Sequence, residues 1–339
     1  MPPGKRPEEH SSMKKNRGNS HPFARILVIL LFAVLLLACA YWLLCLSRPG
    51  LRARLQAKSE SSIRVATINI NAFRYLKTPE DASEYLLSLA GENDIDVMFL
   101  QEYYQSKWFS DEDFRALMAQ EYDYVITDGE QAVISRYPIL DYELTTFPSS
   151  SNTFLTAHME FNGEPVTMIS VHLQTTGFNA VDDEAKTSLA LGYVLKANEE
   201  VRSSQATALR SVIDASEYPV IVAGDFNSVP YSKVYRLVKK NTLKDTYLEK
   251  GKGKGATYRM LQDILRIDYV LHDNSFSCID CVICEDYISD HRMVISTLEK
   301  NDQAKSKCNH PGLQYRKVSG RIFEVTQESD LEGHRSHRH

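Results

Sequence analysis

Acidic, amide and imidazole side chains stand where five apolar, strand-like runs of the sequence end or begin. The runs span residues 65–68, 97–100, 166–171, 220–223 and 293–298, and the side chains beside them are Asn69, Glu102, His172, Asp225, Asn227, Asp290 and His291. A rigid sheet edge holds such groups in register while the loops beyond it admit a substrate. Together they offer oxygen ligands for Mg²⁺ and imidazoles for proton transfer. Taken singly, an Asp or Asn after a strand is usually a turn former, so the prediction depends on the whole set.

The segments between these side chains show the pattern of a layered α/β domain over residues 63–300. β-Branched residues predict a strand over 63–70, a helix follows over 79–90 after Thr78, and an apolar run predicts a buried strand over 96–102. Asn162-Gly163 is a type I′ hairpin signal between runs at 154–161 and 166–173, and it predicts antiparallel pairing. A helix over about 184–215 and strands at 122–127, 132–135, 220–223, 267–271 and 293–298 complete the pattern.

Composition and charge narrow the class of protein. The chain has 339 residues, is 43% hydrophobic, and has too few Gly and Pro to be collagen-like and too few Cys for a disulfide framework. Residues 62–300 carry 22 Lys or Arg against 36 Asp or Glu, which leaves this segment strongly acidic. Tight nucleic-acid binding without sequence preference draws on a basic surface, so the charge disfavours a nuclease.

The N-terminal part of the chain predicts a membrane anchor. Residues 1–22 are polar and basic, and residues 23–46 are apolar, with no charge from Ile26 onwards. That length can cross a bilayer as a helix and exceeds the apolar core of most cleaved signal peptides. We therefore predict an uncleaved signal anchor over 23–46 and a linker over 47–62; a cleaved signal peptide and lipoprotein processing at Cys39 are the alternatives.

The flanking charges and the C-terminal segment complete the expected organisation. Lys and Arg flank both ends of 23–46, so the positive-inside rule favours a cytoplasmic N-terminus only weakly and places the catalytic domain outside the cytoplasm. Residues 301–339 lose the strand and helix pattern and carry four of the ten histidines. We predict a disordered tail there.

Four short motifs resemble the endonuclease/exonuclease/phosphatase superfamily when they are taken in order and at their spacing. They are Gln101-Glu102, Gly224-Asp225-Phe226-Asn227, Arg266-Ile267-Asp268-Tyr269 and Ser289-Asp290-His291, with Val171-His172-Leu173 between the first two. This superfamily has the fold of deoxyribonuclease I, abasic-site endonucleases, bacterial sphingomyelinases and inositol polyphosphate 5-phosphatases. The resemblance covers residues 63–299, and the motif sequences are most similar to those of generic bacterial membrane-associated members. It implies a four-layer α/β sandwich of two mixed β-sheets flanked by helices.

The resemblance also implies a divalent metal ion and a set of phosphate contacts. Glu102 is the expected main ligand of Mg²⁺, with Mn²⁺ as a substitute ion, and Asn69 and Asp290 lie close by. Asp225 would orient and activate the attacking water, and Asn227 would donate a hydrogen bond to the phosphate. These groups supply what phosphate ester hydrolysis requires: charge neutralisation, an oriented water and a cation or proton for the leaving oxygen.

Two histidines would flank the phosphate from opposite sides. His172 and His291 are the candidates, one to help take the proton from water and the other to stabilise charge on the phosphate or the leaving group. Asp268 resembles the family carboxylate that pairs with His291, which sets the tautomer of the imidazole and raises its pKa. The sequence assigns no carboxylate partner to His172.

Departures from the better-defined family branches limit the expected substrate. No second acidic residue stands near Asn69, as it does in abasic-site endonucleases, and the 5-phosphatase signatures are absent. We therefore expect a membrane-anchored Mg²⁺-dependent phosphodiesterase whose substrate the sequence does not define. The alternatives are an extracytoplasmic nuclease and, from another class, a non-catalytic anchored binding module.

Two further groups of residues invite a functional interpretation. Cys278, Cys281 and Cys284 have the spacing of metal ligands, but on a regular strand Cys281 points away from the other two, so we expect small buried hydrophobes instead. The pairs Tyr103-Tyr104 and Trp108-Phe109 follow Glu102 and could form an aromatic wall for a base or an acyl chain. Such residues more often pack on a neighbouring loop.

Overall fold

The computed structural model describes most of the chain from residue 55 to residue 301. The described residues are 55–104, 109–148, 150–176, 188–253, 255–259, 264–301, 315–318 and 322–325, with Phe32 and Leu36 in addition. Residues 1–51 and 52–339 form two separate units, and all elements below belong to the second. The predicted anchor over 23–46 lies outside the described residues except for Phe32 and Leu36. Within the described part of the chain, no helix is long and apolar enough to cross a membrane.

The first six-stranded sheet carries the N-terminal half of the motifs. Its strand order is β11 (Phe276–Ile283), β12 (Val294–Lys300), β1 (Ser62–Asn69), β2 (Val97–Gln101), β4 (Gln131–Ser135) and β3 (Tyr124–Asp128). β1 and β2 are parallel and the other neighbours are antiparallel. Because β1 and β2 run the same way, the residues that follow them, including Glu102, gather at one edge of the sheet.

The second six-stranded sheet carries the remaining strand-end motifs. Its order is β5 (Ile139–Phe147), β6 (Ser150–Phe161), β7 (Glu164–His172), β8 (Val220–Asp225), β10 (Asp268–His272) and β9 (Lys244–Asp245). β7 and β8 are parallel, which places His172 beside Asp225. β10 is antiparallel to β8 and begins at the same edge, which places Asp268 on the other side of Asp225.

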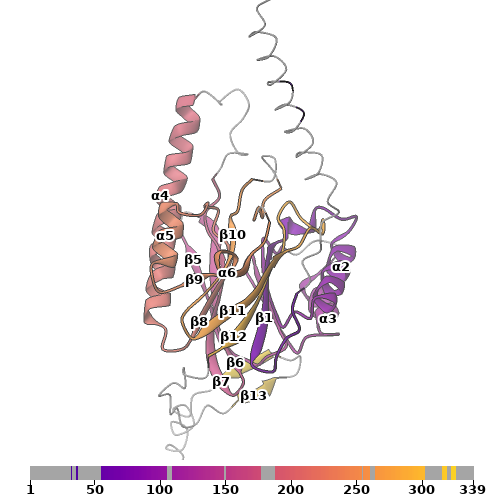
Figure 1. The fold of residues 1–339 in the computed structure, drawn as a ribbon. Helices are drawn as coiled ribbons and strands as arrows, with labels where there is room; N and C mark the ends of the chain where they lie inside the picture. Colours follow the sequence, from indigo (N-terminus) through magenta and orange to yellow (C-terminus); the bar gives the residue numbers. More distant parts are fainter. Residues whose placement is uncertain are drawn as a thin grey trace, which may run out of the picture. The chain divides into compact units, whose positions relative to one another are not determined.

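Helices cover the outer faces of both sheets, as Figure 1 shows. They are η1 (Asn71–Phe73), α2 (Pro79–Glu92) and α3 (Asp111–Met118) beside the first sheet, and α4 (Ser188–Ala215) and α5 (Lys233–Lys239) beside the second, with α6 (Thr246–Lys250) after β9. Two mixed sheets between outer helices confirm the predicted α/β sandwich.

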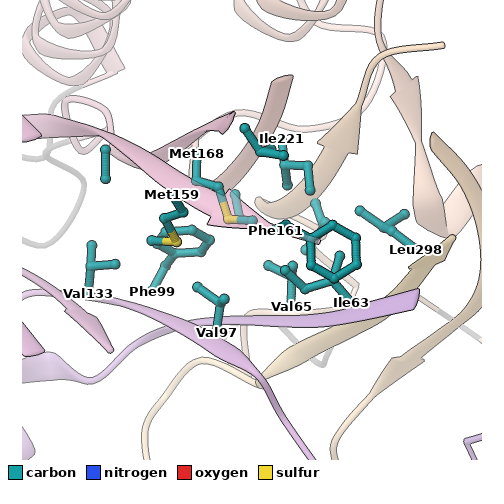
Figure 2. Packing of buried hydrophobic residues seen from close by; sticks show 14 of the residues in the cluster. Ile63, Val65, Val97, Phe99, Val133, Met159, Phe161, Met168, Ile221 and Leu298 are labelled. Atoms are coloured by element: carbon teal, nitrogen blue, oxygen red, sulfur yellow. The ribbon is translucent and has the colours of Figure 1, made fainter. Parts of the chain in front are cut away.

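An apolar core fills the space between the two sheets. Figure 2 shows Val97 and Phe99 of the first sheet facing Met159 and Met168 of the second. Separate outer cores lie under the two sets of helices. Each fully buried large side chain contributes roughly 1.5–3 kcal/mol, so the three cores make the sheet edge that carries the motifs a rigid support.

Local sequence signals explain several element boundaries. Asn162 and Gly163 both have positive φ, as the type I′ turn between β6 and β7 requires. Thr78 accepts a hydrogen bond from the backbone N–H of Asp81 at 3.0 Å, and Pro79 occupies the first turn of α2. The predicted hairpin and the predicted N-cap are both confirmed.

The cysteine segment corrects one prediction made from regular strand geometry. β11 has a bulge between Cys278 and Asp280, which adds one residue to the strand. Cys278 and Cys281 therefore both face the core between the sheets, while Cys284 faces the outer core under α2 and α3. The expectation that Cys278 and Cys284 share a face is wrong, but the three cysteines still do not face one core together, and all three are buried thiols outside any disulfide.

The ends of the domain contain more contacts than the sequence pattern indicated. Within the predicted linker 47–62, the backbone N–H of Gln56 donates to Asp280 at 2.9 Å, and Lys58 forms an ion pair with Asp96 at 2.6 Å. Within the segment 301–339, β13 (Tyr315–Val318) and β14 (Ile322–Val325) form a two-stranded antiparallel sheet. Gln56 and Lys58 of the predicted linker are therefore attached to the domain.

Candidate active site

Strand register brings the polar strand-end residues of both sheets together. In the second sheet, His172 pairs with Asp225 across β7 and β8, and Asp268 pairs with Asp225 across β10 and β8. In the first sheet, Asn69 pairs with Gln101, the residue before Glu102. The site therefore forms where the same edge of the two packed sheets meets.

Asn69 connects the two sheets within this site. Its side-chain Nδ2 donates to Glu102 Oε1 at 3.0 Å and to Asp225 Oδ2 at 3.2 Å. Its Oδ1 accepts from the backbone N–H of Asn71 at 3.0 Å. An amide is suited to this position because its NH₂ group can contact two carboxylates at once.

Asp290 joins the same group of residues through Asn71. Asn71 Nδ2 donates to Asp290 Oδ1 at 2.9 Å. Next to Asp290, Ser289 Oγ donates to the backbone carbonyl of Asn69 at 2.6 Å, which ties the Ser289-Asp290-His291 motif to β1. Sequence reasoning missed Asn71, although it lies only two residues after Asn69.

His291 forms a buried pair with Asp268, as predicted. The Nδ1 atom of His291 lies 2.9 Å from Asp268 Oδ2, and its Nε2 atom lies 3.8 Å from Asp225 Oδ2. Burial alone would lower the pKa of His291, but the carboxylates of Asp268 and Asp225 outweigh it and raise the pKa to about 10. Nε2 is thus a proton-bearing group directed at Asp225.

His172 has a carboxylate partner that the sequence did not reveal. Its Nδ1 atom lies 2.6 Å from Glu130 Oε2, and both side chains are buried. Its Nε2 atom lies 3.8 Å from Glu102 Oε1 and 3.9 Å from Asp225 Oδ2. Burial opposes the charged imidazole, but the hydrogen bond and charge of Glu130 prevail and raise the pKa of His172.

Glu130 is itself held in place by β6. Its Oε1 accepts from the backbone N–H of Thr153 at 2.8 Å and from the Thr153 hydroxyl at 3.2 Å. Asn152, the preceding residue, contacts His172 Nε2 through its carboxamide at 2.9 Å. The only sequence signal for Glu130 is its place directly before an apolar strand, where a carboxylate is also an ordinary turn residue.

Asp225 lies between the two imidazoles and is held by its neighbours. Its Oδ1 accepts from the backbone N–H of Asn227 at 2.7 Å, and Asn227 Nδ2 also donates to the carbonyl of Leu173 at 3.0 Å. Burial and the nearby Asp268 raise the pKa of Asp225 to about 6, although both histidines act against the rise. Asp225 can therefore exchange a proton near neutral pH.

Two places at this edge could hold a metal ion: the buried group of Asp225, Asp268 and His291, and the more exposed carboxylate of Glu102. Asp225, Asp268 and His291 bring one ligand atom each within 4.8 Å of one another, and all three side chains are buried. Glu102 is different, because its side chain is 31% exposed and has Asn69 beside it. A carboxylate that solvent reaches is the better match for an ion that keeps several waters, as Mg²⁺ does.

Backbone strain is concentrated at this edge of the sheets. Among the described residues, the non-glycine positions with positive φ here are Asn71, Ala72, Phe73, Glu102, Asn227 and Tyr231. Positive φ costs free energy for residues other than Gly and persists where the surroundings impose it. Two of the residues, Glu102 and Asn227, are the predicted metal ligand and the predicted phosphate contact, so the strained positions coincide with predicted site residues.

The replacement Glu130→Gln is expected to lower the pKa of His172 and to destabilise the domain by about 1–3 kcal/mol. The amide removes the charge that favours the imidazolium and leaves buried polar atoms imperfectly paired. NMR titration of the His172 ring and urea unfolding measure the two effects. Glu285→Gln is the control, since Glu285 is an exposed carboxylate that pairs with Arg292. An unchanged pKa of His172 would contradict the pairing.

Comparison with known proteins gives a single family. The model of the endonuclease/exonuclease/phosphatase family matches residues 66–291, and this range contains all the predicted site residues, from Asn69 to His291. No curated protein sequence matches the chain.

Several solved structures share the fold at low sequence identity. An endonuclease/exonuclease/phosphatase from Beutenbergia cavernae has 20% identity and a TM-score of 0.54, covering 71% of this chain and 72% of that one. TDP2 from D. rerio, complexed with a single-strand DNA product, has 17% identity and a TM-score of 0.52, covering 71% and 100%. A family protein from Bacteroides thetaiotaomicron has 15% identity and a TM-score of 0.52, covering 71% and 98%.

Proposed function

The chain belongs to the endonuclease/exonuclease/phosphatase family, whose members are metal-dependent hydrolases of phosphate ester bonds, and we propose that it is a Mg²⁺-dependent phosphodiesterase. The observation that carries the proposal is the position of Asp225. Its carboxylate lies 3.8 Å from one imidazole and 3.9 Å from another, and each imidazole has its own buried carboxylate. This arrangement provides a proton acceptor between two proton-bearing groups.

The residues at the edge of the first sheet fit a Mg²⁺ ion. Glu102, with Asp290 nearby, would hold the ion through carboxylate oxygens, and Asn69, whose Nδ2 donates to Glu102 and Asp225, would position these carboxylates beside it. Bound Mg²⁺ would supply charge neutralisation at the phosphoryl oxygens and the leaving oxygen. Asp268 and His291 are already paired with each other at 2.9 Å and are almost fully buried, so we assign them to proton handling rather than to the ion.

The chain's own groups account for the remaining steps. Asp225, with a pKa raised to about 6, would accept the proton of the attacking water. His172 and His291 would hold their protons at Nε2 and donate hydrogen bonds to the phosphoryl oxygens from either side of Asp225. Asn227 would orient the phosphate, since the hydrogen bonds to Asp225 and Leu173 hold its side chain at the edge.

We further propose that residues 23–46 anchor the enzyme in a membrane, with the catalytic domain outside the cytoplasm. The support is the run of 21 residues without charge from Ile26 to Leu46, which is long enough to span the hydrocarbon core. In the sequence, eight residues, 47–54, separate this segment from Leu55, the first described residue of the domain.

A substrate panel tests the proposed function. The full chain is assayed with Mg²⁺, with Mn²⁺ and with chelator on a soluble diester, a soluble monoester, a phospholipid and plasmid DNA. We expect hydrolysis of the diester that Mg²⁺ stimulates and chelator blocks. The absence of metal-dependent hydrolysis on every substrate would instead identify a binding module.

A nuclease is the second candidate because TDP2, a structural neighbour, is described with a single-strand DNA product. The acidic charge of residues 62–300 argues against it. A plasmid-nicking assay at low and moderate salt separates the two. We expect only weak cleavage that moderate salt suppresses; robust cleavage at moderate salt would favour the nuclease.

The rate of hydrolysis is expected to rise with pH through about 6 and to fall above about 10. Asp225 must be ionised to accept a proton, and its pKa is raised to about 6. His291 must keep its proton, and its pKa is raised to about 10.

The raised pKa of His291 also has an effect on folding stability. Its contribution is fully present below the unfolded pKa of about 6.5 and is lost as pH rises through about 10. A rate profile and thermal unfolding over pH measure both effects, and a rate that does not change between pH 5 and 7 would contradict the role of Asp225.

A further inference from the structure

Polar side chains replace the apolar core between the two sheets at the level next to the candidate active site. Figure 2 shows the apolar core itself, which includes Phe99, Val133 and Met168. Two positions away on the same three strands, where side chains point to the same face, the residues are Gln101, Gln131 and Ser170. All three are fully buried. Polar residues therefore occupy positions at which the strand pattern calls for apolar ones.

These side chains form one directed chain of hydrogen bonds that ends on Glu130. Gln101 Nε2 donates to Ser170 Oγ at 3.1 Å, and Ser170 Oγ donates to Gln131 Oε1 at 2.6 Å. Gln131 Nε2 donates to the Thr153 hydroxyl at 3.3 Å, and that hydroxyl donates to Glu130 Oε1 at 3.2 Å. We call Gln101, Ser170, Gln131 and Thr153 the donor chain. Each bond in such a chain polarises the next, so the donor chain acts on the carboxylate of Glu130.

Both ends of the donor chain lead to predicted site residues. At one end, Glu130 Oε2 lies 2.6 Å from His172 Nδ1. At the other end, Gln101 directly precedes Glu102. The residue after Glu102 is Tyr103, and its backbone N–H donates to the carbonyl of Glu130 at 3.0 Å. Glu102 is therefore attached on both sides to the segment that also holds His172.

The stability of the fold does not account for a polar layer at this place. Within the part of the chain that the structure describes, no side chain of the donor chain has a buried N or O atom without a hydrogen-bond partner. Gln101 Nε2, for example, also donates to the Thr67 hydroxyl at 3.1 Å. Even a satisfied buried hydrogen bond contributes little net stability, and apolar groups of the same shape in place of both partners can be as stable. The layer therefore points to a purpose other than stability.

We propose that the donor chain consists of positioning residues, which fix the His172 imidazole relative to the Glu102 carboxylate. His172 Nε2 lies 3.8 Å from Glu102 Oε1, and the two residues come from different sheets. A displacement of about 1 Å in a reacting geometry can cost a large part of the rate, so a hydrogen-bonded link between the sheets at this level serves catalysis. The inference rests on the proposed phosphodiesterase function, in which Glu102 binds Mg²⁺ and His172 contacts the phosphate.

Paired substitutions at Thr153 test the last link of the donor chain. Thr153→Val removes the hydroxyl but keeps the shape and the backbone N–H that also donates to Glu130, whereas Thr153→Ser keeps the hydroxyl. The full chain is assayed with Mg²⁺ on bis-p-nitrophenyl phosphate. We expect Thr153→Val to lower kcat by about tenfold and to leave KM within about twofold. Thr153→Ser should keep kcat within about twofold of the unaltered chain, and an equal loss in both variants would overturn the role of the hydroxyl.

Ser170→Ala tests whether the donor chain acts as a unit, because Ser170 reaches Glu130 only through Gln131 and Thr153. We expect kcat to fall by about threefold or more. Ser296→Ala is the matched control, since Ser296 is also fully buried and its hydroxyl donates to Thr246 at 2.9 Å, outside the donor chain. The control should keep kcat within about twofold. Equal losses in the two variants would overturn the proposal, because they would reflect a general weakening of the core.

The Nδ1 proton of His172 gives a readout that does not depend on activity. It lies in the contact of 2.6 Å with Glu130, where both side chains are buried. The NMR resonance of this proton is followed in the full chain with isotope-labelled histidine. We expect Thr153→Val and Ser170→Ala to shift the resonance and to accelerate its exchange with water, and Ser296→Ala to change neither. A resonance that is unaltered in both donor-chain variants would overturn the proposal.

The outcomes separate this inference from the proposed function. If the unaltered chain does not hydrolyse the diester with Mg²⁺, the proposed function fails, whereas the resonance of His172 still decides whether the donor chain holds the imidazole. A changed resonance with an unchanged kcat in both donor-chain variants overturns the positioning role and leaves the phosphodiesterase standing. If Ser170→Ala does not fold, the comparison of Thr153→Val with Thr153→Ser decides alone.

Discussion

Replacing Asp225 by Asn is expected to lower the rate of phosphodiester hydrolysis by about 10²- to 10⁴-fold, the range typical of a lost general base. Asp225 Oδ2 lies 3.8 Å from His291 Nε2 and 3.9 Å from His172 Nε2, so no other described carboxylate has the same place between the imidazoles. An amide of the same shape cannot accept the proton of water. Steady-state kinetics on the soluble diester with Mg²⁺ measure the loss.

The same variant is expected to remain folded. Asn can keep the hydrogen bond that Asp225 Oδ1 accepts from the backbone N–H of Asn227. Because the pKa of Asp225 is raised to about 6, the ionised carboxylate is unfavourable in the folded protein. The protonated carboxyl stabilises the fold at low pH, and this contribution is lost as pH rises through about 6. A neutral amide removes that unfavourable ionisation at neutral pH. The midpoint of thermal unfolding should therefore not fall by more than a few degrees.

Asp141→Asn provides the control for a carboxylate outside the site. Asp141 lies on β5, is exposed, and pairs with His158. We expect its replacement to leave the rate within about twofold, because exposed ion pairs contribute little. Near-normal turnover of Asp225→Asn would remove Asp225 from the mechanism, and an unfolded variant would give it a structural role instead.

The strand-end residues of the site were predictable because their signal is local. Asn69, His172 and Asp225 each end an apolar run, and the register of neighbouring strands then brings them together without any further information. Asp268 could be assigned to His291 through the family resemblance, and the distance of 2.9 Å confirms the pairing. In such sheets the ends of paired strands at one edge lie close together. The pattern of apolar runs in the sequence was therefore enough to predict this part of the site.

Glu130 could not be predicted because its role depends on which strands are neighbours. It precedes β4, and it reaches His172 only because β4 lies against β6 and β7 of the other sheet. The sequence contains no marker for contacts between sheets. The bulge in β11 could not be predicted either. Its additional residue places Cys278 and Cys284 on opposite faces of the sheet, and no Gly or Pro in this segment indicates it.

Short helices and edge strands account for most of the remaining differences. The pattern did not predict α3, although Ser110 and Asp113 form a capping box at its start. β5 and α5 were also missed. β5 is exposed along much of its length, and α5 has only seven residues, so neither gives a long apolar periodicity.

Replacing Gly224 by Ala is expected to destabilise the domain by more than about 4 kcal/mol, among the largest effects of a single methyl group. Gly224 has a φ of 146°, and a Cβ atom there would lie 2.0 Å from the carbonyl oxygen of Val171. The three atoms nearest to that Cβ are O, N and C of Val171, all in the backbone, so no flexible side chain can move aside. Only a separation of β7 from β8 would relieve the overlap, and these strands carry His172 and Asp225.

Gly91→Ala is the matched control, because a Cβ atom at Gly91 in α2 would meet nothing within 4 Å. This change should stabilise the helix by up to about 1 kcal/mol, since Ala has the higher helix propensity. Thermal unfolding of both variants measures the difference, and a loss of more than about 10 °C is expected for Gly224→Ala alone. If Gly224→Ala unfolded at the unaltered temperature, β7 and β8 could not be as close as the structure places them, and the contact between His172 and Asp225 would need another explanation.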